Sequence, residues 1–93
     1  MENLEGDMPT ICEFFGIIIR MYYNDENPPH FHAIYGEFEI RVGINNLEII
    51  DGDLPSSQIK MVLKWAKQHH NELKEEWKRI EKKEPLFKIE PLK

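Results

Sequence analysis

The chain has 93 residues, of which 41% are hydrophobic and 31% are charged, and its formal net charge is −5. This length predicts one domain with a modest core, and the composition excludes a disordered chain. No apolar run approaches the roughly 20 residues that span a bilayer, and one cysteine cannot form an internal disulfide. The acidic start MENLEGDMPT does not resemble a secretory signal. We expect a cytoplasmic protein, with a loose leader over residues 1–8 and one domain over residues 9–93.

Charge is distributed unevenly along the chain. Residues 1–54 carry 2 basic and 11 acidic side chains, whereas residues 55–93 carry 10 basic and 6 acidic ones. The simpler interpretation is a solvated basic helix after an acidic sheet. The alternative is a charged surface for a partner of opposite charge. The negative total disfavours tight non-specific nucleic-acid binding by the whole chain, and leaves specific recognition open.

The first half of the chain predicts strands. Residues 14–23 (FFGIIIRMYY) are rich in β-branched and aromatic side chains, and their alternation directs one set inward, namely Phe15, Ile17, Ile19 and Met21. The break NDENPP follows. Further strands are predicted over residues 30–35, 37–44 and 47–50, with Gly36 in the connection between the first two.

The second half changes to a helical period. From Pro55 to Lys82, apolar residues recur at spacings of three and four, which predicts one long helix. Pro85 ends it, and residues 86–91 form a short extended tail that adds a strand or lies along the helix. The expected fold class is α+β, with a small antiparallel sheet of three or four strands, one long helix packed across it and the short extended C-terminal tail.

The candidate chemistry lies where the segment PPHFH enters a strand. His30 and His32 are two residues apart and therefore share a face of that strand. If Phe31 packs inward, both histidines face solvent beside Arg20 and Tyr22. Histidine can act as general acid or base, and arginine can hold a phosphate at two points. This set of candidate catalytic residues suits metal-independent phosphoryl transfer, such as RNA cleavage.

Two other interpretations of the histidine segment stay open. In the first, the histidines only fix the loop, together with the loop-structural residues Asn27, Pro28, Pro29 and Gly36. In the second, the His-x-His pair supplies two metal ligands, and a third comes from one of four residues, Asp25, Glu26, Glu39 or His69. No spacing in the sequence demands a metal, so we predict no metal and no cofactor.

Met61 and Trp65 lie off the main apolar stripe of the predicted helix. They either widen the face packed on the sheet or expose an apolar patch. In the second case they are partner-binding residues for a partner helix or for a second copy in a homo-oligomer.

Three segments resemble one bacterial family, the domain-of-unknown-function family 4160. They are FFGIIIRMYYNDENPPHFHAIYGEFE, LPSSQIKMVLKWAKQHHNEL and PLFKIEPL, so the resemblance runs from about Met8 to Leu92. One departure is Glu26, where relatives commonly carry histidine. The family's characteristic positions correspond here to Arg20, Tyr22, Tyr23, Asn27, Pro28, Pro29, His30, Phe31, His32 and Gly36.

The resemblance implies a small bacterial protein that works with a small protein partner encoded nearby, and some members are labelled as toxin components of toxin–antitoxin pairs. Together with the histidine pair, it favours a toxin-like component with ribonuclease-type phosphoryl-transfer chemistry. The alternative is a non-enzymatic regulatory module that binds protein or DNA through its sheet edge or its basic helix.

Overall fold

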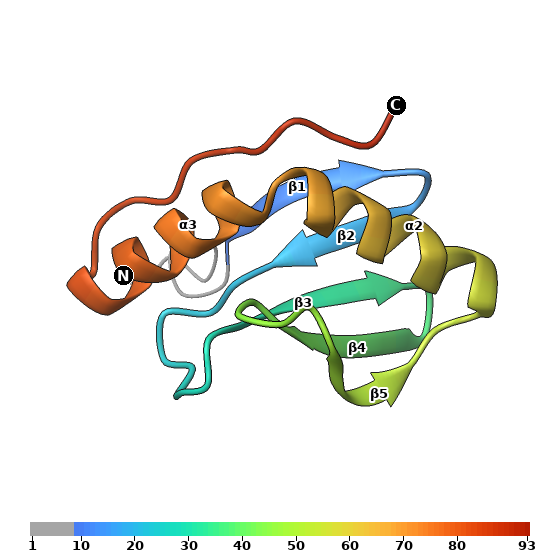
Figure 1. Cartoon of the computed structure of the whole chain (residues 1–93), viewed down its shortest axis with the longest axis horizontal. Coiled ribbons are helices and arrows are strands. Elements are labelled where there is room, and N and C mark those ends of the chain that lie inside the picture. Colours follow the sequence, from blue (N-terminus) through green and yellow to red (C-terminus); the bar gives the residue numbers. More distant parts are fainter. Residues whose placement is uncertain (1–8) are drawn as a thin grey trace, which may run out of the picture.

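Five antiparallel strands form one sheet, in the order in which they follow one another along the chain (Figure 1). The computed structural model describes residues 9–93, and the leader expected over residues 1–8 lies outside the described residues. Each strand pairs with the next, so the sheet is a meander with its first and last strands at the edges. The strands are β1 (Thr10–Phe14), β2 (Ile17–Arg20), β3 (His30–Tyr35), β4 (Phe38–Gly43) and β5 (Ile49–Asp53).

Two helices, α2 (Ser56–Gln68) and α3 (His70–Lys82), pack across one face of this sheet (Figure 1). Neither is long and apolar enough to cross a membrane. Alternate side chains of the strands meet the helices, as a half-buried sheet requires. The buried core includes Ile17, Ile19, Phe31, Ala33, Ile40, Val42, Val62, Trp65, Leu73 and Ile80.

The predicted α+β class is confirmed, but the predicted strand count is wrong, because the expected first strand, residues 14–23, begins at a hairpin turn and a further strand, β1, precedes that turn. Phe15 has φ 48° and Gly16 has φ 78°, and two successive positive φ values make the tight turn that matches strand twist. The turn leaves Phe15 61% exposed, although it was expected in the core, whereas Ile17, Ile19 and Met21 are buried as predicted.

The predicted single long helix is also wrong, since the helix is interrupted at His69, where φ is −117° and ψ is 29°. One long-range contact and one local contact hold the two histidines at the break. The His70 ring bonds to the carbonyl oxygen of Ile44, and His69 Nδ1 lies 2.6 Å from a carboxylate oxygen of Glu72. We attribute the break to these contacts, which hydrophobic periodicity does not report.

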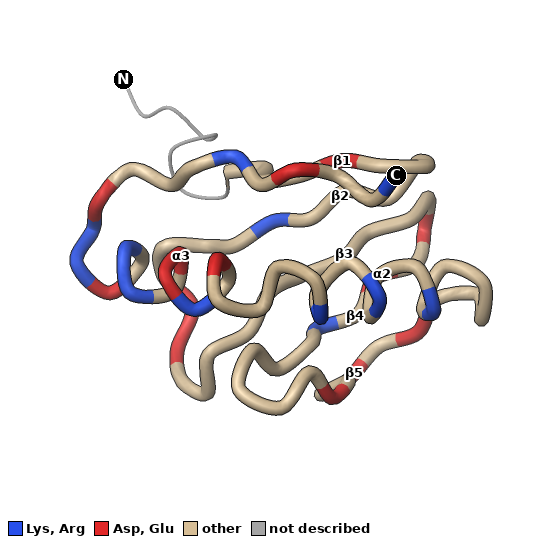
Figure 2. The backbone as a smooth tube through the Cα atoms, turned by 45° about the horizontal axis from the view of Figure 1, so that its top comes forward, with Lys and Arg blue, Asp and Glu red and all other residues tan. Residues whose placement is uncertain are grey.

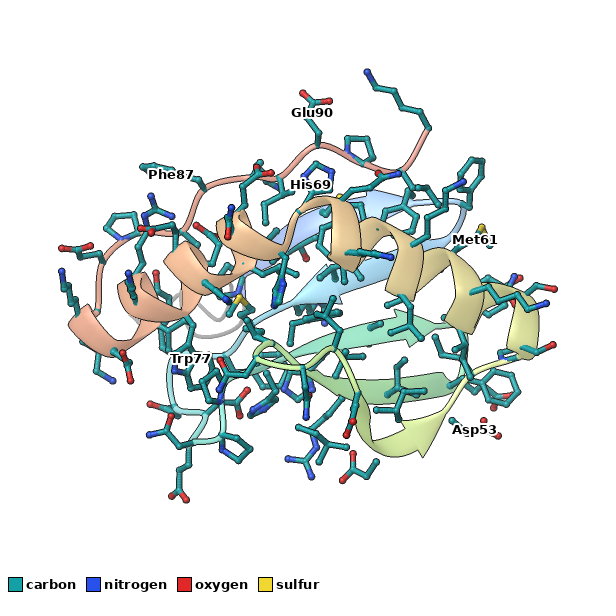
Figure 3. The ribbon with its side chains drawn as sticks, in the orientation of Figure 1. Asp53, Met61, His69, Trp77, Phe87 and Glu90 are labelled. Atoms are coloured by element: carbon teal, nitrogen blue, oxygen red, sulfur yellow. The ribbon has the colours of Figure 1, made fainter. Side chains whose placement is uncertain are left out.

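The C-terminal tail, residues 84–93, runs beside β1 and the helices (Figures 1 and 3). The backbone N–H of Ile89 donates to the carbonyl of Ile11 at 2.9 Å. Trp65 Nε1 donates to the carbonyl of Glu90 at 2.8 Å. The tail therefore lies against the edge of the sheet and also closes over the core, although it forms no regular strand.

A buried carboxylate fixes the start of this tail. Glu76 on α3 is 1% exposed. It accepts the backbone N–H of Phe87 at 3.1 Å, and it pairs with Arg79, whose guanidinium also lies 3.9 Å above the Phe87 ring. Burial raises the pKa of Glu76, because the Phe87 N–H and Arg79 only partly offset the loss of hydration.

The raised pKa of Glu76 predicts a pH dependence of stability. Between the ordinary pKa of 4.5 and the raised one, the folded state holds the Glu76 proton while the unfolded state releases it. The contribution of Glu76 to the free energy of unfolding therefore decreases as pH rises through that window. We expect Glu76→Gln to remove this decrease when urea unfolding is compared at several pH values. Parallel pH profiles for the two proteins would contradict it.

Candidate metal centre

His30 and His32 enter the site from β3, whose alternate residues Phe31 and Ala33 are fully buried in the core. The two imidazoles therefore point to the sheet face opposite the core. His32 pairs across the sheet with Arg20 of β2 and with Arg41 of β4. The same-face arrangement that strand alternation predicts is thus present.

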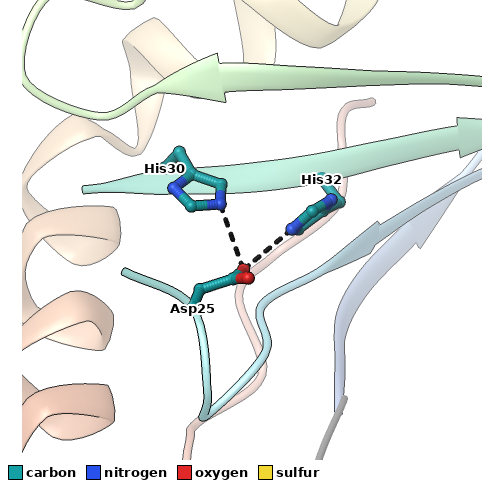
Figure 4. Close-up of side chains that lie close together, drawn as sticks. All are labelled: Asp25, His30 and His32. Carbon is teal, nitrogen blue, oxygen red and sulfur yellow. Dashed lines mark hydrogen bonds and ion pairs between the residues drawn. The ribbon is translucent and has the colours of Figure 1, made fainter. Parts of the chain in front are cut away.

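The loop between β2 and β3 brings a carboxylate to both rings (Figure 4). The backbone N–H of Asp25 donates to the carbonyl of Tyr22 at 3.2 Å, which turns the chain back toward β3. Asp25 Oδ2 lies 3.1 Å from His30 Nε2 and 2.8 Å from His32 Nε2. One carboxylate oxygen therefore faces two imidazole nitrogens.

The other nitrogen of each ring is held by a hydrogen-bond acceptor. His30 Nδ1 lies 2.8 Å from the carbonyl oxygen of Pro28, and His32 Nδ1 lies 2.8 Å from Glu39 Oε2. Carbonyl and carboxylate oxygens are acceptors, so each Nδ1 is placed to donate. If the single N–H of a neutral imidazole is on Nδ1, each Nε2 presents a lone pair to Asp25, whereas an N–H on His32 Nε2 would donate to Asp25 Oδ2, 2.8 Å away.

This arrangement brings together three atoms that can each act as a metal ligand. His30 Nε2 is buried, and its ring is not aligned for a hydrogen bond to Asp25 despite the 3.1 Å separation, so it has no hydrogen-bond partner among the described residues. Asp25, His30 and His32 each offer one ligand atom, and these three atoms lie within 4.8 Å of one another. Either added protons or one cation can satisfy this cluster.

Aromatic side chains enclose the two imidazoles. Tyr22 stacks on His32 with ring centroids 4.2 Å apart, and Trp77 of α3 lies 5.6 Å from the His30 ring. His30 is 3% exposed and His32 is 5% exposed, so the expectation that both face solvent is wrong, because Tyr22 and the Asp25 loop cover them. Burial raises the pKa of the Tyr22 hydroxyl, and the charge of Glu39 acts in the same direction.

The cluster borders a cavity of about 430 Å³. Asp25 and His30 form part of its lining, and Arg41 and Ile50 form another part. Arg41 is held by Asp51, which accepts from Nε at 2.9 Å and also from Nη2. This hydrogen-bonded pair lowers the pKa of Asp51. The cavity gives solvent and small molecules a route to the Asp25 side of the cluster.

A family described as "Domain of unknown function (DUF4160)" matches residues 16–78, which is more than half of the chain and includes the whole cluster. The chain belongs to the DUF4160 family. The comparison with curated proteins gave no significant match, and neither did the comparison with solved structures. The resemblance seen in the sequence is therefore confirmed at the level of the family.

The structure of this DUF4160 protein brings together part of the predicted catalytic set. Tyr22 stacks on His32, and His32 contacts His30. Arg20 lies directly opposite His32 on β2 and close to Tyr22, but its Nε donates to the hydroxyl of Thr10 at 3.3 Å rather than to a histidine. Asp25 was one of four alternatives for a third ligand, and it is the one that meets both Nε2 atoms. Of the other three, Glu39 holds His32 Nδ1, Glu26 lines the cavity, and His69 pairs with Glu72 on the helices.

The loop-structural residues lie where the sequence predicts them. The Pro28 carbonyl orients His30, and the Pro29 carbonyl accepts the backbone N–H of Ile44 at 2.9 Å. Asn27 lines the cavity, and Gly36 turns the chain between β3 and β4 with φ 58°.

Trp65 and Met61, the two predicted partner-binding residues, differ in their placement. Trp65 is fully buried, so it widens the face of α2 that packs on the sheet. Met61 is half-buried at the edge of the core (Figure 3).

Proposed function

We propose that this protein binds one divalent transition-metal ion through Asp25 Oδ2, His30 Nε2 and His32 Nε2. The observation that carries the proposal is the convergence of both Nε2 atoms on one carboxylate oxygen while both Nδ1 atoms contact acceptor oxygens elsewhere. A cation accepts all three lone pairs at once. Two histidines and one carboxylate form a known ligand set for zinc and for non-haem iron.

The two separations between the carboxylate oxygen and the imidazole nitrogens suit this ligand set. Metal–ligand bonds of about 2.0–2.2 Å, at angles of about 90–110°, place neighbouring ligand atoms about 2.8–3.6 Å apart. The carboxylate oxygen of Asp25 lies 2.8 and 3.1 Å from the two nitrogens.

The outer partners also fit a metal centre. Metal-binding histidines ordinarily donate their second ring N–H to a backbone carbonyl or a carboxylate, which fixes the ring and its tautomer. Pro28 and Glu39 are such acceptors for His30 and His32.

The chemistry that follows is metal-assisted reaction of water. Three protein ligands leave coordination positions for water, which distinguishes catalytic from structural metal sites. The bordering cavity supplies space for a substrate on the Asp25 side. We therefore favour a metal-dependent hydrolytic role over a purely structural one.

The metal-independent ribonuclease chemistry expected from the sequence has less support in this geometry. A base and an acid acting on one phosphate need nitrogens that face the substrate, but both Nε2 atoms face Asp25 and both Nδ1 atoms are held. Cleavage of RNA that persists in EDTA and disappears in the His30→Ala/His32→Ala double variant would favour the metal-independent chemistry. The toxin-like role, the small protein partner and the regulatory binding module stay predictions.

Titration with Co²⁺ tests the metal centre, because the visible absorption of cobalt reports its ligands. We expect one bound ion per chain, and competition by Zn²⁺. We expect Asp25→Asn to weaken binding by about 100-fold or more, since it removes the ligand charge while keeping the side-chain shape. Glu39→Gln is expected to weaken binding by about 10–100-fold through the orientation of His32.

A matched control is His69→Gln, which removes a histidine that contacts a carboxylate outside the cluster. It should leave Co²⁺ affinity unchanged. Circular dichroism of each variant shows whether the fold is retained. Absence of stoichiometric Co²⁺ and Zn²⁺ binding to the folded wild-type protein would overturn the proposal, and it would assign the cluster to a protonated His32 between two carboxylates.

A further inference from the structure

The cavity beside the proposed metal centre has one basic side chain among its described lining residues, that of Arg41. Its other polar lining comes from the amides of Asn24 and Asn27, the imidazole of His30 and the carboxylates of Asp25 and Glu26. A volume of about 430 Å³ lies within the range of small-molecule sites. The cavity therefore has room for a small molecule, and the charge that such a molecule can carry depends on the balance between Arg41 and the carboxylates.

Arg41 is oriented before any ligand arrives. Asp51, its cross-strand partner, accepts from Nε and Nη2. A guanidinium has five N–H donors in a rigid fork. The remaining donors form no hydrogen bond to another described residue, so they are free for an acceptor in the cavity.

The metal ion determines whether that acceptor can be an anion. Without it, Asp25 and Glu26 give the lining a negative charge, since Asp51 neutralises Arg41. A divalent cation held by Asp25 offsets the charges of these two carboxylates, so the lining no longer repels an anion. An anion would then contact the ion on one side and the remaining N–H donors of Arg41 on the other.

We infer that the cavity binds a small oxyanion, a phosphate or a carboxylate, with one oxygen on the metal ion and another on the free donors of Arg41. This inference rests on the proposed metal centre. Long polyanions fit poorly, because acidic residues lie on β5 (Figure 2) and on the loop between β2 and β3, among them Glu26, Asp51 and Asp53. The substrate class of the proposed hydrolytic role is therefore a small phosphorylated or carboxylated compound.

Titrating inorganic phosphate and oxalate into the Co²⁺-loaded protein tests the inference through the visible spectrum of cobalt. We expect at least one of the two anions to change the spectrum saturably, and the preferred anion identifies the phosphate or the carboxylate class. Isothermal titration of metal-free protein should show no binding of either anion. Arg41→Gln should leave Co²⁺ affinity within about threefold and weaken the anion by about 10–100-fold, because the charged hydrogen bonds are lost.

Two further variants separate the outcomes. Arg41→Lys keeps the positive charge but loses the planar guanidinium with its several N–H donors. We expect this variant to bind the anion with an affinity between those of the wild type and of Arg41→Gln. Lys60→Gln removes one positive charge from the exposed surface of α2 and should change nothing. Failure of Co²⁺ to bind would overturn the proposed function, whereas Co²⁺ binding with anion affinities that do not depend on Arg41 would overturn this inference alone.

Discussion

Replacing Trp65 with alanine is expected to lower the free energy of unfolding by about 3–5 kcal/mol, a large part of the total for a domain of this size. The Trp65 ring is fully buried and packs against Phe14 and Phe31, with ring centroids 5.6 and 5.8 Å away. Alanine would leave a cavity between sheet and helix and would leave the Glu90 carbonyl without its donor. Urea unfolding followed by circular dichroism measures the change.

Trp65→Phe helps to separate the two contributions, because it keeps most of the side-chain volume and removes the N–H donor together with a small part of the ring system. We expect a loss of about 1–2 kcal/mol for this variant. Equal losses for Trp65→Phe and Trp65→Ala would contradict the packing argument. Both variants should bind Co²⁺ as the wild type does, because Trp65 lies on the opposite sheet face from the cluster.

Replacing Gly52 with alanine is expected to destabilise the fold by about 3 kcal/mol or more and also to weaken metal binding. Gly52 lies on β5 opposite Ile40, with φ 89°. An added Cβ would lie 2.2 Å from the carbonyl oxygen of Glu39. Strain at this φ adds to the overlap, and relief of the overlap must move β5 or the Glu39 backbone, whose side chain orients His32.

Gly36→Ala is the matched control, since Gly36 also has a positive φ, of 58°, but an added Cβ there would meet nothing within 4 Å. We expect a loss of about 1 kcal/mol for this variant and unchanged Co²⁺ affinity. If the two glycine variants lost the same stability, the close approach of β5 to β4 would not be the cause.

The regular part of the sheet could be predicted from sequence, because alternation reports directly which side chains enter a core. The strand expected over residues 30–35 is observed with those bounds as β3. The hairpin at Phe15 and Gly16 was missed, because Phe-Gly lacks the Asn or Asp that usually marks such a turn. The break at His69 was missed because contacts distant in sequence, such as that of His70 with Ile44, determine it.

The candidate site was predictable in part for the same reason. Because side chains alternate between the two faces of a strand, the sequence places His30 and His32 on one face, together with Arg20. Which acidic residue meets them depends on the path of an irregular loop, so four alternatives for a third ligand were equivalent in the sequence. The burial of the histidines and the Pro28 carbonyl that contacts His30 also depend on that loop, whereas Glu39, the acceptor beside His32, lies on β4.

The position of the C-terminal tail bears on how this sheet avoids polymerising. An open strand edge offers unpaired N–H and C=O groups on which other chains can assemble into aggregates. The tail covers the edge at β1 through the bond from Ile89 to Ile11. At the other edge, β5 carries Asp51 and Asp53 around Gly52, and charge with irregular backbone discourages such assembly. The chain thus protects one edge with its own last residues and the other with negative charge.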